Sequence, residues 1–332
     1  MKYTHGSILD KYPWQSRNTF PKGKQISEGK TNQKGKQIKK ENKPLKGSQI
    51  PERKAKPQKG KQTPERKSNP QKRKANPNIR HRRSLLYMNI LHLTDLHFSI
   101  EDDKEHVANK WKEIITLARS NHEKTPIDVI AVTGDVTCHG MKEEFDQAKN
   151  YLLKLLRALS LEKECLWLCP GNHDADSEEA HSTFAHYEEF AENFKKQTIA
   201  DHRRPFFAFY SINTCTETSL TFFDRAVIPS DDAEVLSARD KKNYGILLMH
   251  HQPEVIKNQD MLMKIANGGK IRLILCGHLH STDTRLYSVN NCVVVNGMAV
   301  TPHLPWLFAG MQIVHISTRG RVETKAIHLS GK

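Results

Sequence analysis

Hydrophobic and polar residues alternate in short blocks from Leu85 to the C-terminus, whereas residues 1–83 contain almost no apolar run. The apolar blocks are rich in β-branched residues and end in polar turns, which is typical of buried strands. This pattern predicts eight strands, at residues 89–94, 127–133, 164–169, 206–212, 244–249, 271–276, 292–295 and 311–316. The chain is therefore divided into a tail, residues 1–87, and a folded domain, residues 88–332.

Two amphipathic segments lie between the early strands. Residues 105–120 and 143–159 carry apolar side chains three and four positions apart, which predicts helices. Strands that alternate with helices indicate an α/β fold with a largely parallel sheet covered on both faces. Beyond His280, strands joined by Asn-Asn and Thr-Arg-Gly turns predict that a second sheet is antiparallel. Residues 177–196, which carry aromatic side chains at helical spacing, form either a packed helix or a lid over a substrate.

The tail repeats a short polar unit. Lys-Gly-Lys-Gln-Ile begins at Lys22 and again at Lys34, and related units begin at Lys46 and Lys59. Such a unit has too little apolar surface to offset the entropy of ordering the chain, so we expect the tail to be disordered. Three interpretations stay open: a basic arm for nucleic acid or an anionic surface, an inert solvated extension, or a translation start at Met88 that leaves the tail out.

The net charge of the chain is +15, which would suggest a nucleic-acid or membrane-surface partner if it were evenly spread. It is not evenly spread, because 25 of the 52 basic residues but only 5 of the 37 acidic residues lie in the tail. The remaining 27 basic and 32 acidic residues make the folded domain mildly acidic. Any attraction to nucleic acid therefore belongs to the tail.

The cysteines and the N-terminus bear on the compartment. The six cysteines form no CxxC pair or regular framework, so we expect reduced thiols. The N-terminus lacks the apolar core of a secretory signal, and no stretch approaches the roughly 20 apolar residues of a membrane span. These features predict a cytoplasmic protein without a transmembrane segment.

Polar side chains with metal-binding chemistry follow five of the predicted strands. In chain order they are Asp95 and His97, Gly134-Asp135, Gly171-Asn172-His173-Asp174, His250-His251, and Gly277-His278 with His280. Ligands of open α/β sheets bind beyond the carboxyl ends of the strands, so these residues are expected to meet. A mixed set of carboxylate, amide and imidazole groups favours transition metals over calcium or magnesium alone. Each element is weak alone, but together they predict a metal site.

Taken in this order, the five elements resemble the signature of the calcineurin-like metallophosphoesterase superfamily. The third element, together with the Gly-His-x-His ending, resembles its cyclic-nucleotide phosphodiesterase-like branch. The resemblance extends from Met88 to about Ser317 and includes no part of the tail. It implies a four-layer αββα sandwich of two mixed sheets, with two metal ions at its rim, and hydrolysis of a phosphodiester or phosphomonoester.

The resemblance also implies which residues bind two divalent or trivalent metal ions. Manganese and iron are the preferred metals, and zinc is the alternative. The first ion would be bound by Asp95, His97, Asp135 and His280. The second would be bound by Asp135, Asn172, His250 and His278, with Asp135 bridging both. The family pattern of His followed by His or Gln and then Pro favours His250 over His251 as the ligand.

Two residues beside Asn172 complete the expected chemistry. His173 would stabilise the phosphoryl oxygens or protonate the leaving alkoxide, because an imidazole exchanges protons readily near neutral pH. Asp174 would hold the His173 ring in orientation, as carboxylates commonly do for catalytic histidines. Two other histidines are interpreted as structural: His92 as a core residue bonded to backbone, and His139 as a solvated loop residue.

The substrate is less constrained than the site. Loops rather than the fold set the substrate of such an enzyme. A small phosphoester of nucleotide type, including a cyclic nucleotide, is the first choice. The alternatives are a nuclease whose basic tail holds nucleic acid, and a non-catalytic scaffold that binds proteins. A scaffold would be expected to have lost ligands, and none is missing from this sequence.

Overall fold

The computed structural model describes residues 87–176, 183–194, 206–215, 226–238, 243–267, 271–289, 291–302 and 309–330. Apart from Tyr87, the predicted tail lies outside these residues, so its disorder and its binding role stay predictions. None of the described helices is long and apolar enough to cross a lipid bilayer.

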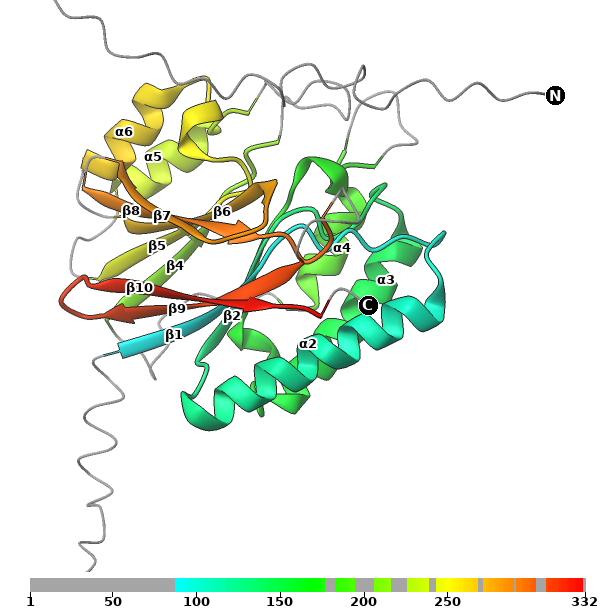
Figure 1. Cartoon of the computed structure of the whole chain (residues 1–332). Helices are drawn as coiled ribbons and strands as arrows, with labels where there is room; N and C mark the ends of the chain where they lie inside the picture. The colour runs from blue at the N-terminus through cyan, green and yellow to red at the C-terminus, as the bar shows by residue number, and fades with distance from the viewer. Residues whose placement is uncertain are drawn as a thin grey trace, which may run out of the picture. The chain divides into compact units, whose positions relative to one another are not determined.

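The first sheet has five strands in the order β10-β9-β1-β2-β3 (Figure 1). Its strands are β1 (Tyr87–Leu93), β2 (Val129–Thr133), β3 (Leu166–Cys169), β9 (Gly310–Ser317) and β10 (Val322–His328). The first three are parallel to one another, while β9 runs antiparallel to β1 and to β10. Because β1 lies in the middle of this sheet, its side chains after Tyr87 are buried on both faces, including the polar side chains of Asn89 and His92.

The second sheet also has five strands, in the order β4-β5-β6-β8-β7. Its strands are β4 (Phe207–Ser211), β5 (Tyr244–Leu248), β6 (Ile271–Ser281), β7 (Arg285–Val289) and β8 (Cys292–Met298). Four of them are parallel and only β7 is antiparallel, so both sheets are mixed. The prediction of an antiparallel second sheet is therefore wrong. Hairpin turns are local signals, and they do not reveal that the β9–β10 hairpin joins the first sheet or that β8 returns beside β6.

Helices cover the outer faces of the two sheets (Figure 1). The first sheet carries α2 (Lys104–Lys124), α3 (Lys142–Ala158) and α4 (Ala185–Glu192), and the second carries α5 (Ser230–Ala238) and α6 (Gln259–Asn267). Three short 3-10 helices, η2 (Lys163–Cys165), η3 (Asn172–Asp174) and η4 (Pro253–Val255), lie in connections. The four-layer sandwich of two mixed sheets is confirmed, as are the eight predicted strands and the two predicted helices.

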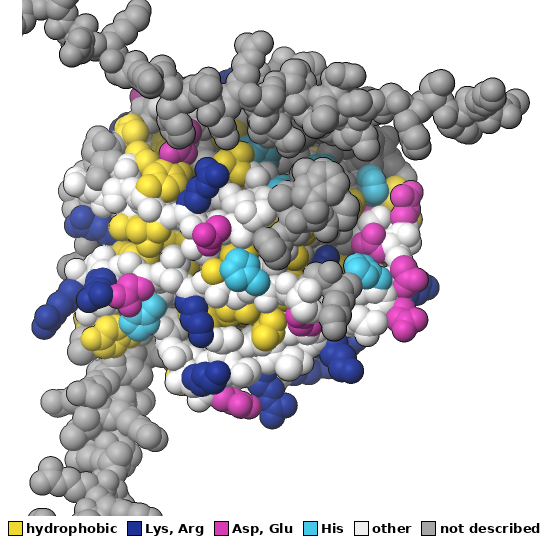
Figure 2. Space-filling view, in the orientation of Figure 1, with side chains coloured by type: hydrophobic (Ala, Val, Ile, Leu, Met, Phe, Trp, Pro, Cys, Tyr) yellow, Lys and Arg dark blue, Asp and Glu magenta, His cyan; other side chains and the backbone are white. Residues whose placement is uncertain are grey.

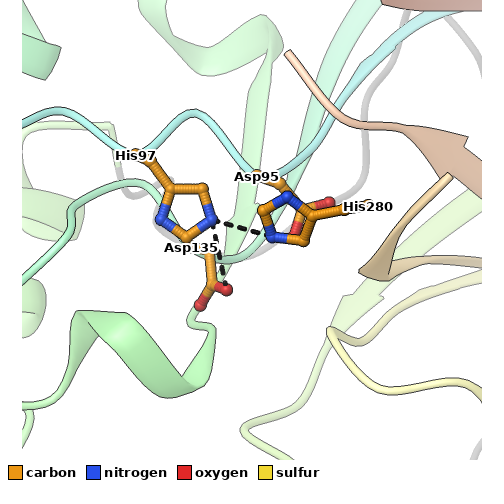
Figure 3. Close-up of side chains that lie close together, drawn as sticks. All are labelled: Asp95, His97, Asp135 and His280. Carbon is orange, nitrogen blue, oxygen red and sulfur yellow. Dashed lines mark hydrogen bonds and ion pairs between the residues drawn. The ribbon is translucent and has the colours of Figure 1, made fainter. Parts of the chain in front are cut away.

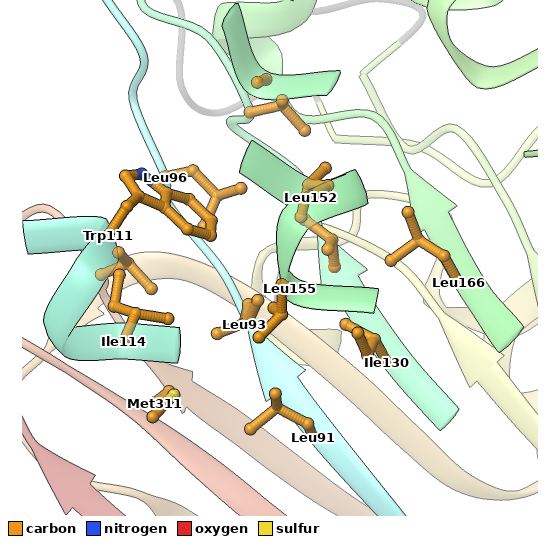
Figure 4. Close-up of a cluster of buried hydrophobic side chains, with 14 of the residues drawn as sticks. Leu91, Leu93, Leu96, Trp111, Ile114, Ile130, Leu152, Leu155, Leu166 and Met311 are labelled. Atoms are coloured by element: carbon orange, nitrogen blue, oxygen red, sulfur yellow. The ribbon is translucent and has the colours of Figure 1, made fainter. Parts of the chain in front are cut away.

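Strand alternation assigns side chains to different layers of the core. Leu91 and Leu93 of β1 pack under the helices with Trp111 of α2 and Leu152 of α3 (Figure 4). Ile90, which points the other way, packs against the second sheet in a separate cluster between the sheets. The two sheets are thereby held face to face, and the carboxyl ends of their strands stay at a common edge.

The aromatic segment at residues 177–196 contributes to this core. Tyr187 and Phe190 of α4, and Phe194 just beyond it, are buried in the cluster beneath the helices. The ring centroids of Phe190 and of Phe145 in α3 lie 5.1 Å apart. This is the arrangement expected of a packed helix rather than of a lid. Residues 177–182 and 195–196 lie outside the described residues.

Candidate metal centre

The loops that bear the predicted ligands meet at the carboxyl edge of the sheets. Backbone hydrogen bonds tie the first two loops together, from Asp95 N to Gly134 O at 3.1 Å and from His97 N to Asp135 O at 3.0 Å. An isolated β-bridge between Thr94 and Ala299 then joins the first sheet to the second at this edge. The close spacing of the loops follows from the strand order, because β1 and β2 are neighbours.

The backbone of the site is held in an unusual conformation. Asp95, His97, Asp135, His278 and His280 have φ between 45° and 73°, in the left-handed region. Ser160 is the only other residue, glycines aside, with positive φ in the described part of the chain. Each such residue costs on the order of 1–3 kcal/mol, and strain of this kind persists at functional sites because the surrounding structure imposes it. The concentration of strain at the predicted ligands supports a functional role for this edge.

A first group of side chains joins Asp95, His97, Asp135 and His280 (Figure 3). The Nε2 atoms of His97 and His280 lie 3.0 Å apart. Nε2 of His97 is 3.7 Å from Oδ2 of Asp135, and Nε2 of His280 is 3.5 Å from Oδ1 of Asp95. All four residues are buried, so their ligand atoms converge in a space screened from bulk water.

A second group shares Asp135 with the first and adds His250 and His278. Nε2 of His250 lies 3.3 Å from Oδ2 of Asp135 and 3.2 Å from Nδ1 of His278. The same nitrogen is 3.1 Å from the amide oxygen of Asn172. His251 points elsewhere, with Nδ1 3.0 Å from the hydroxyl of Thr214. The tertiary structure thus brings His250 into the group, as the family pattern favours.

Several features of these groups fit bound metal. Oδ2 of Asp95 is buried and has no hydrogen-bond partner among the described residues, which is costly unless a cation is bound there. Imidazole nitrogens face one another at 3.0 and 3.2 Å, where lone pairs could converge on an ion. Carboxylate oxygens and imidazole nitrogens together suit manganese, iron and zinc. The residues present therefore fit two metal ions that share Asp135.

The electrostatics of the metal-free groups follow from burial and crowding. Burial raises the pKa of Asp95 to about 7, with the carboxylate of Asp135 adding to the rise and His250 opposing it. Burial alone would also raise the pKa of Asp135, but the charge and hydrogen bond of His250 hold it well below its ordinary value. Burial in turn lowers the pKa of His250, yet the same carboxylate raises it to about 9. The positive charge on His250 and the negative charge on Asp135 therefore stabilise each other.

His173 lies beside the candidate ligands, but the partner of its ring differs from the prediction. Its backbone N–H donates to Oδ1 of Asp135 at 2.9 Å, and its ring lies edge-on to the ring of His97 with centroids 4.9 Å apart. The partner of its ring Nδ1 is the backbone carbonyl of Cys138, at 2.9 Å. Nε2 has no partner among the described residues, and the side chain is partly exposed. The ring therefore presents one free nitrogen next to the candidate metal ligands.

Asp174 does not orient this ring, so that prediction is wrong. One of its carboxylate oxygens accepts hydrogen bonds from the backbone N–H and the hydroxyl of Thr137, at 2.9 and 3.0 Å, and the other accepts from Gly171 N at 2.8 Å. Burial, with a contribution from Asp135, raises the pKa of Asp174 to about 6. Its carboxylate thus joins the loop that contains Thr137 to the loop that contains Gly171, instead of holding the His173 ring.

The structure largely agrees with the interpretation of His92 and His139 as structural residues. His92 is buried, but it bonds side chains rather than backbone: Nε2 lies 2.8 Å from the hydroxyl of Thr133 and Nδ1 lies 2.7 Å from the amide nitrogen of Gln312. Burial lowers the pKa of His92 to about 3, so the ring is neutral. His139 is a loop residue with its side chain 43% exposed, and its ring Nδ1 lies 2.9 Å from the carboxylate of Glu144.

Polar residues that hydrogen-bond around the candidate ligands were not predicted from the sequence. The carbonyl of Thr133 accepts hydrogen bonds from the hydroxyl of Thr94 and, in the corresponding tautomer, from Nδ1 of His250, each at 3.0 Å. The amide of Gln252 donates to Asn296 Oδ1 at 2.7 Å and to the carbonyl of Gly277. A polar residue at the end of an apolar strand is the signal that could have identified Thr94 and Thr133.

A family model described as calcineurin-like phosphoesterase matches residues 88–282. No curated protein matches the chain in sequence.

Several solved structures also match the chain, at low sequence identity. GAP50 of the inner membrane complex of Plasmodium shares 12% identity, over 74% of this chain and 86% of that one, with a TM-score of 0.44. The NAD nucleotidase NadN of Haemophilus influenzae shares 14% identity, over 73% of this chain and 50% of that one, with a TM-score of 0.43. Phosphopantetheinyl hydrolase from Mycobacterium tuberculosis shares 15% identity, over 64% and 90% of the two chains, with a TM-score of 0.37. None of these similarities bears on the activity of this chain.

Proposed function

The chain belongs to the calcineurin-like phosphoesterase family, and we propose that its residues 88–332 hydrolyse a phosphoester bond at two metal ions. The observation that carries the proposal is the position of Asp135, whose carboxylate belongs to both groups of candidate ligands. A shared carboxylate is the feature by which two ions are held a short distance apart. The free nitrogen of His173, beside these groups, supports catalysis rather than storage of metal.

Each ion has its own ligand set in this proposal. Asp95, His97, Asp135 and His280 would hold the first, and Asp135, Asn172, His250 and His278 would hold the second. Manganese or iron is favoured, with zinc as the alternative, because imidazole and carboxylate ligands are mixed in both sets. When bound, the two ions would activate a water molecule and polarise the phosphoryl group.

The protein's own contribution to bond cleavage centres on His173. With the Cys138 carbonyl as its partner, the ring keeps its Nδ1–H, so protonation at Nε2 gives a donor directed away from the loop. That proton passes to the oxygen of the departing alcohol, which avoids release of an alkoxide. The packing of the His173 ring against His97 keeps Nε2 next to the metal ligands throughout this step.

We favour a small phosphoester of nucleotide type, including a cyclic phosphodiester, as the substrate. The support for this choice is the resemblance of Gly171-Asn172-His173-Asp174 and Gly277-His278-x-His280 to the cyclic-nucleotide phosphodiesterase-like branch. The nuclease interpretation depends on the basic tail, which lies outside the described residues, and it stays a prediction. The cytoplasmic location likewise stays a prediction.

Metal-dependent turnover by the full-length protein tests the proposal. EDTA-treated protein is reloaded with manganese and assayed on bis(p-nitrophenyl) phosphate and p-nitrophenyl phosphate. Asp135→Asn should lower turnover by at least about 100-fold, because replacing even an outer-shell partner can cost that much. Asp146→Asn, at an exposed position of α3, is the matched control and should leave turnover unchanged.

Metal analysis separates the possible outcomes. The wild-type chain should retain two manganese ions after gel filtration, and Asp135→Asn should retain fewer. Wild-type turnover in the Asp135→Asn variant would overturn the site assignment. A folded wild-type protein that binds metal but cleaves neither ester would instead point to a narrowly specific enzyme or to a scaffold.

A further inference from the structure

Glu144 is a fully buried carboxylate that takes no part in the proposed chemistry. It lies in the first turn of α3, with 0% of its side chain exposed, while its neighbour Glu143 is exposed. Burial of an ionisable group is unfavourable unless specific partners compensate for the lost water. The partners of Glu144 therefore indicate why an acidic residue is retained inside the protein.

Both carboxylate oxygens of Glu144 contact one residue of the loop that follows Asp135. Oε2 accepts a hydrogen bond from the backbone N–H of His139 at 2.9 Å, and Oε1 lies 2.9 Å from Nδ1 of the same histidine. The carboxylate has no other hydrogen-bond partner among the described residues. Glu144 thus holds His139 at two points, one on the main chain and one on the ring.

The peptide bond between Cys138 and His139 links this contact to the proposed active site. Its N–H, on His139, is held by Glu144, and its C=O, on Cys138, is the partner of Nδ1 of His173 at 2.9 Å. A peptide group is planar, so its N–H and C=O cannot turn independently. An acceptor that fixes the N–H therefore also fixes the direction of the carbonyl.

The rest of the loop is anchored so that this peptide is the element left to orient. Just before this peptide, the backbone N–H and the hydroxyl of Thr137 donate hydrogen bonds to Asp174. The N–H of Cys138 donates to the carbonyl of Phe98 at 2.9 Å. Among the residues that the structure describes, only the carboxylate of Glu144 holds the N–H of the following peptide.

We propose that Glu144 is a positioning residue for His173. By holding the Cys138–His139 peptide, it directs the Cys138 carbonyl at Nδ1 of His173, which keeps the ring proton on Nδ1 and leaves Nε2 facing the substrate. The use of Nε2 rests on the proposed phosphoesterase activity. The position of the proton on the ring is a property of the protein itself and can be measured without metal or substrate.

The first test is the tautomer of His173 in the metal-free, full-length protein. Histidine-selective ¹⁵N labelling, with His173→Ala to assign the signal, distinguishes an Nδ1–H ring from an Nε2–H ring by chemical shift. The wild type and Glu143→Leu, the matched control on the exposed neighbour, should show Nδ1–H. Glu144→Leu should shift the signal toward Nε2–H, and Glu144→Gln, whose amide oxygen can still accept from the His139 N–H, should restore it.

The second test uses the leaving group of the substrate. A displaced proton donor harms esters with a basic leaving group most, so Glu144→Leu should lower kcat for phenyl phosphate by about 10- to 100-fold. Turnover of p-nitrophenyl phosphate, whose leaving group departs without a proton, should fall by less than about threefold. His173→Ala should show the same pattern, and adding Glu144→Leu to it should cause no further loss.

The outcomes distinguish this inference from the proposed function. If the wild type cleaves no ester, the proposed function loses its support from these substrates, and the tautomer measurement still decides the inference. If a folded Glu144→Leu protein keeps the wild-type tautomer, or loses turnover of both esters equally, the inference is overturned. Should Glu144→Leu not fold, Glu144→Asp keeps the charge but is one methylene shorter, and it should shift the tautomer in the same direction.

Discussion

Replacing Gly171 with alanine tests the close contact between the two loops that carry Asp135 and Asn172. Gly171 has φ of −107° and ψ of −179°, an extended conformation that alanine adopts without strain. A Cβ built on Gly171 would nevertheless lie 2.8 Å from Cγ of Asp135, and closer still to its Oδ1 and backbone N. The position requires glycine because of its neighbour rather than because of its backbone conformation.

The expected magnitude follows from these contacts. Carbon atoms in favourable contact are about 3.5–4.0 Å apart, so the carboxylate of Asp135 must move by roughly 1 Å. Metal sites tolerate deviations of only about 0.2 Å in ligand distance. A displacement of about 1 Å at a reacting centre can lower the rate about 100-fold, and overpacking of this kind lowers the free energy of unfolding by about 1–3 kcal/mol.

Three measurements on the full-length protein test this expectation: manganese affinity, turnover of p-nitrophenyl phosphate at saturating manganese, and the melting temperature without metal. Gly171→Ala should weaken manganese binding at least about tenfold and lower turnover about 100-fold. Gly320→Ala is the control, because its φ of +86° strains alanine while the nearest atom to a new Cβ, in Tyr244, is 3.9 Å away. It should lose about 1 kcal/mol of stability and keep full activity.

The reasoning would be refuted if Gly171→Ala bound manganese and turned over substrate like the wild type. An equal loss of activity in Gly320→Ala would also refute it, because that loss would come from general destabilisation rather than from displacement of Asp135.

Further predictions concern pH, metal and core packing. Because burial lowers the pKa of His92 from 6.5 to about 3, the unfolded chain binds a proton that the folded protein does not. Acidification from pH 6.5 to 5 should therefore remove about 2 kcal/mol of unfolding free energy through this group, and urea titration of metal-free His92→Gln should lack that loss. Since burial raises the pKa of Asp95 to about 7, a metal ion must displace its proton below that pH; calorimetry should show manganese affinity falling from pH 8 to pH 6, and an unchanged affinity would contradict the assignment. Leu152→Ala, in the buried cluster under α3, should lower the unfolding free energy by about 2–5 kcal/mol in denaturant titration, and a loss below about 1 kcal/mol would be evidence against that packing.

Much of the candidate site was accessible to sequence reasoning because ligand chemistry resides in side chains. Asp95, Asp135 and His250 each follow an apolar strand, and parallel strands end at one edge, so their convergence could be expected. The partner of His173 could not be expected in the same way. Every residue offers a backbone carbonyl, so nothing in the identity of Cys138 marks its carbonyl as the acceptor for that ring, whereas the adjacent Asp174 was a plausible but incorrect choice.

The sequence by itself determined eight of the strands, the helices α2 and α3, and which residue types stand at the strand ends, because periodicity and turn chemistry act over a few residues; it did not predict α5 and α6. The tertiary structure decided the features that depend on distant segments. It assigned the β9–β10 hairpin to the first sheet, directed His250 rather than His251 toward Asp135, and forced five candidate ligands into left-handed conformations. These outcomes arise from packing between segments far apart in the chain, where the energy of many contacts outweighs local preference.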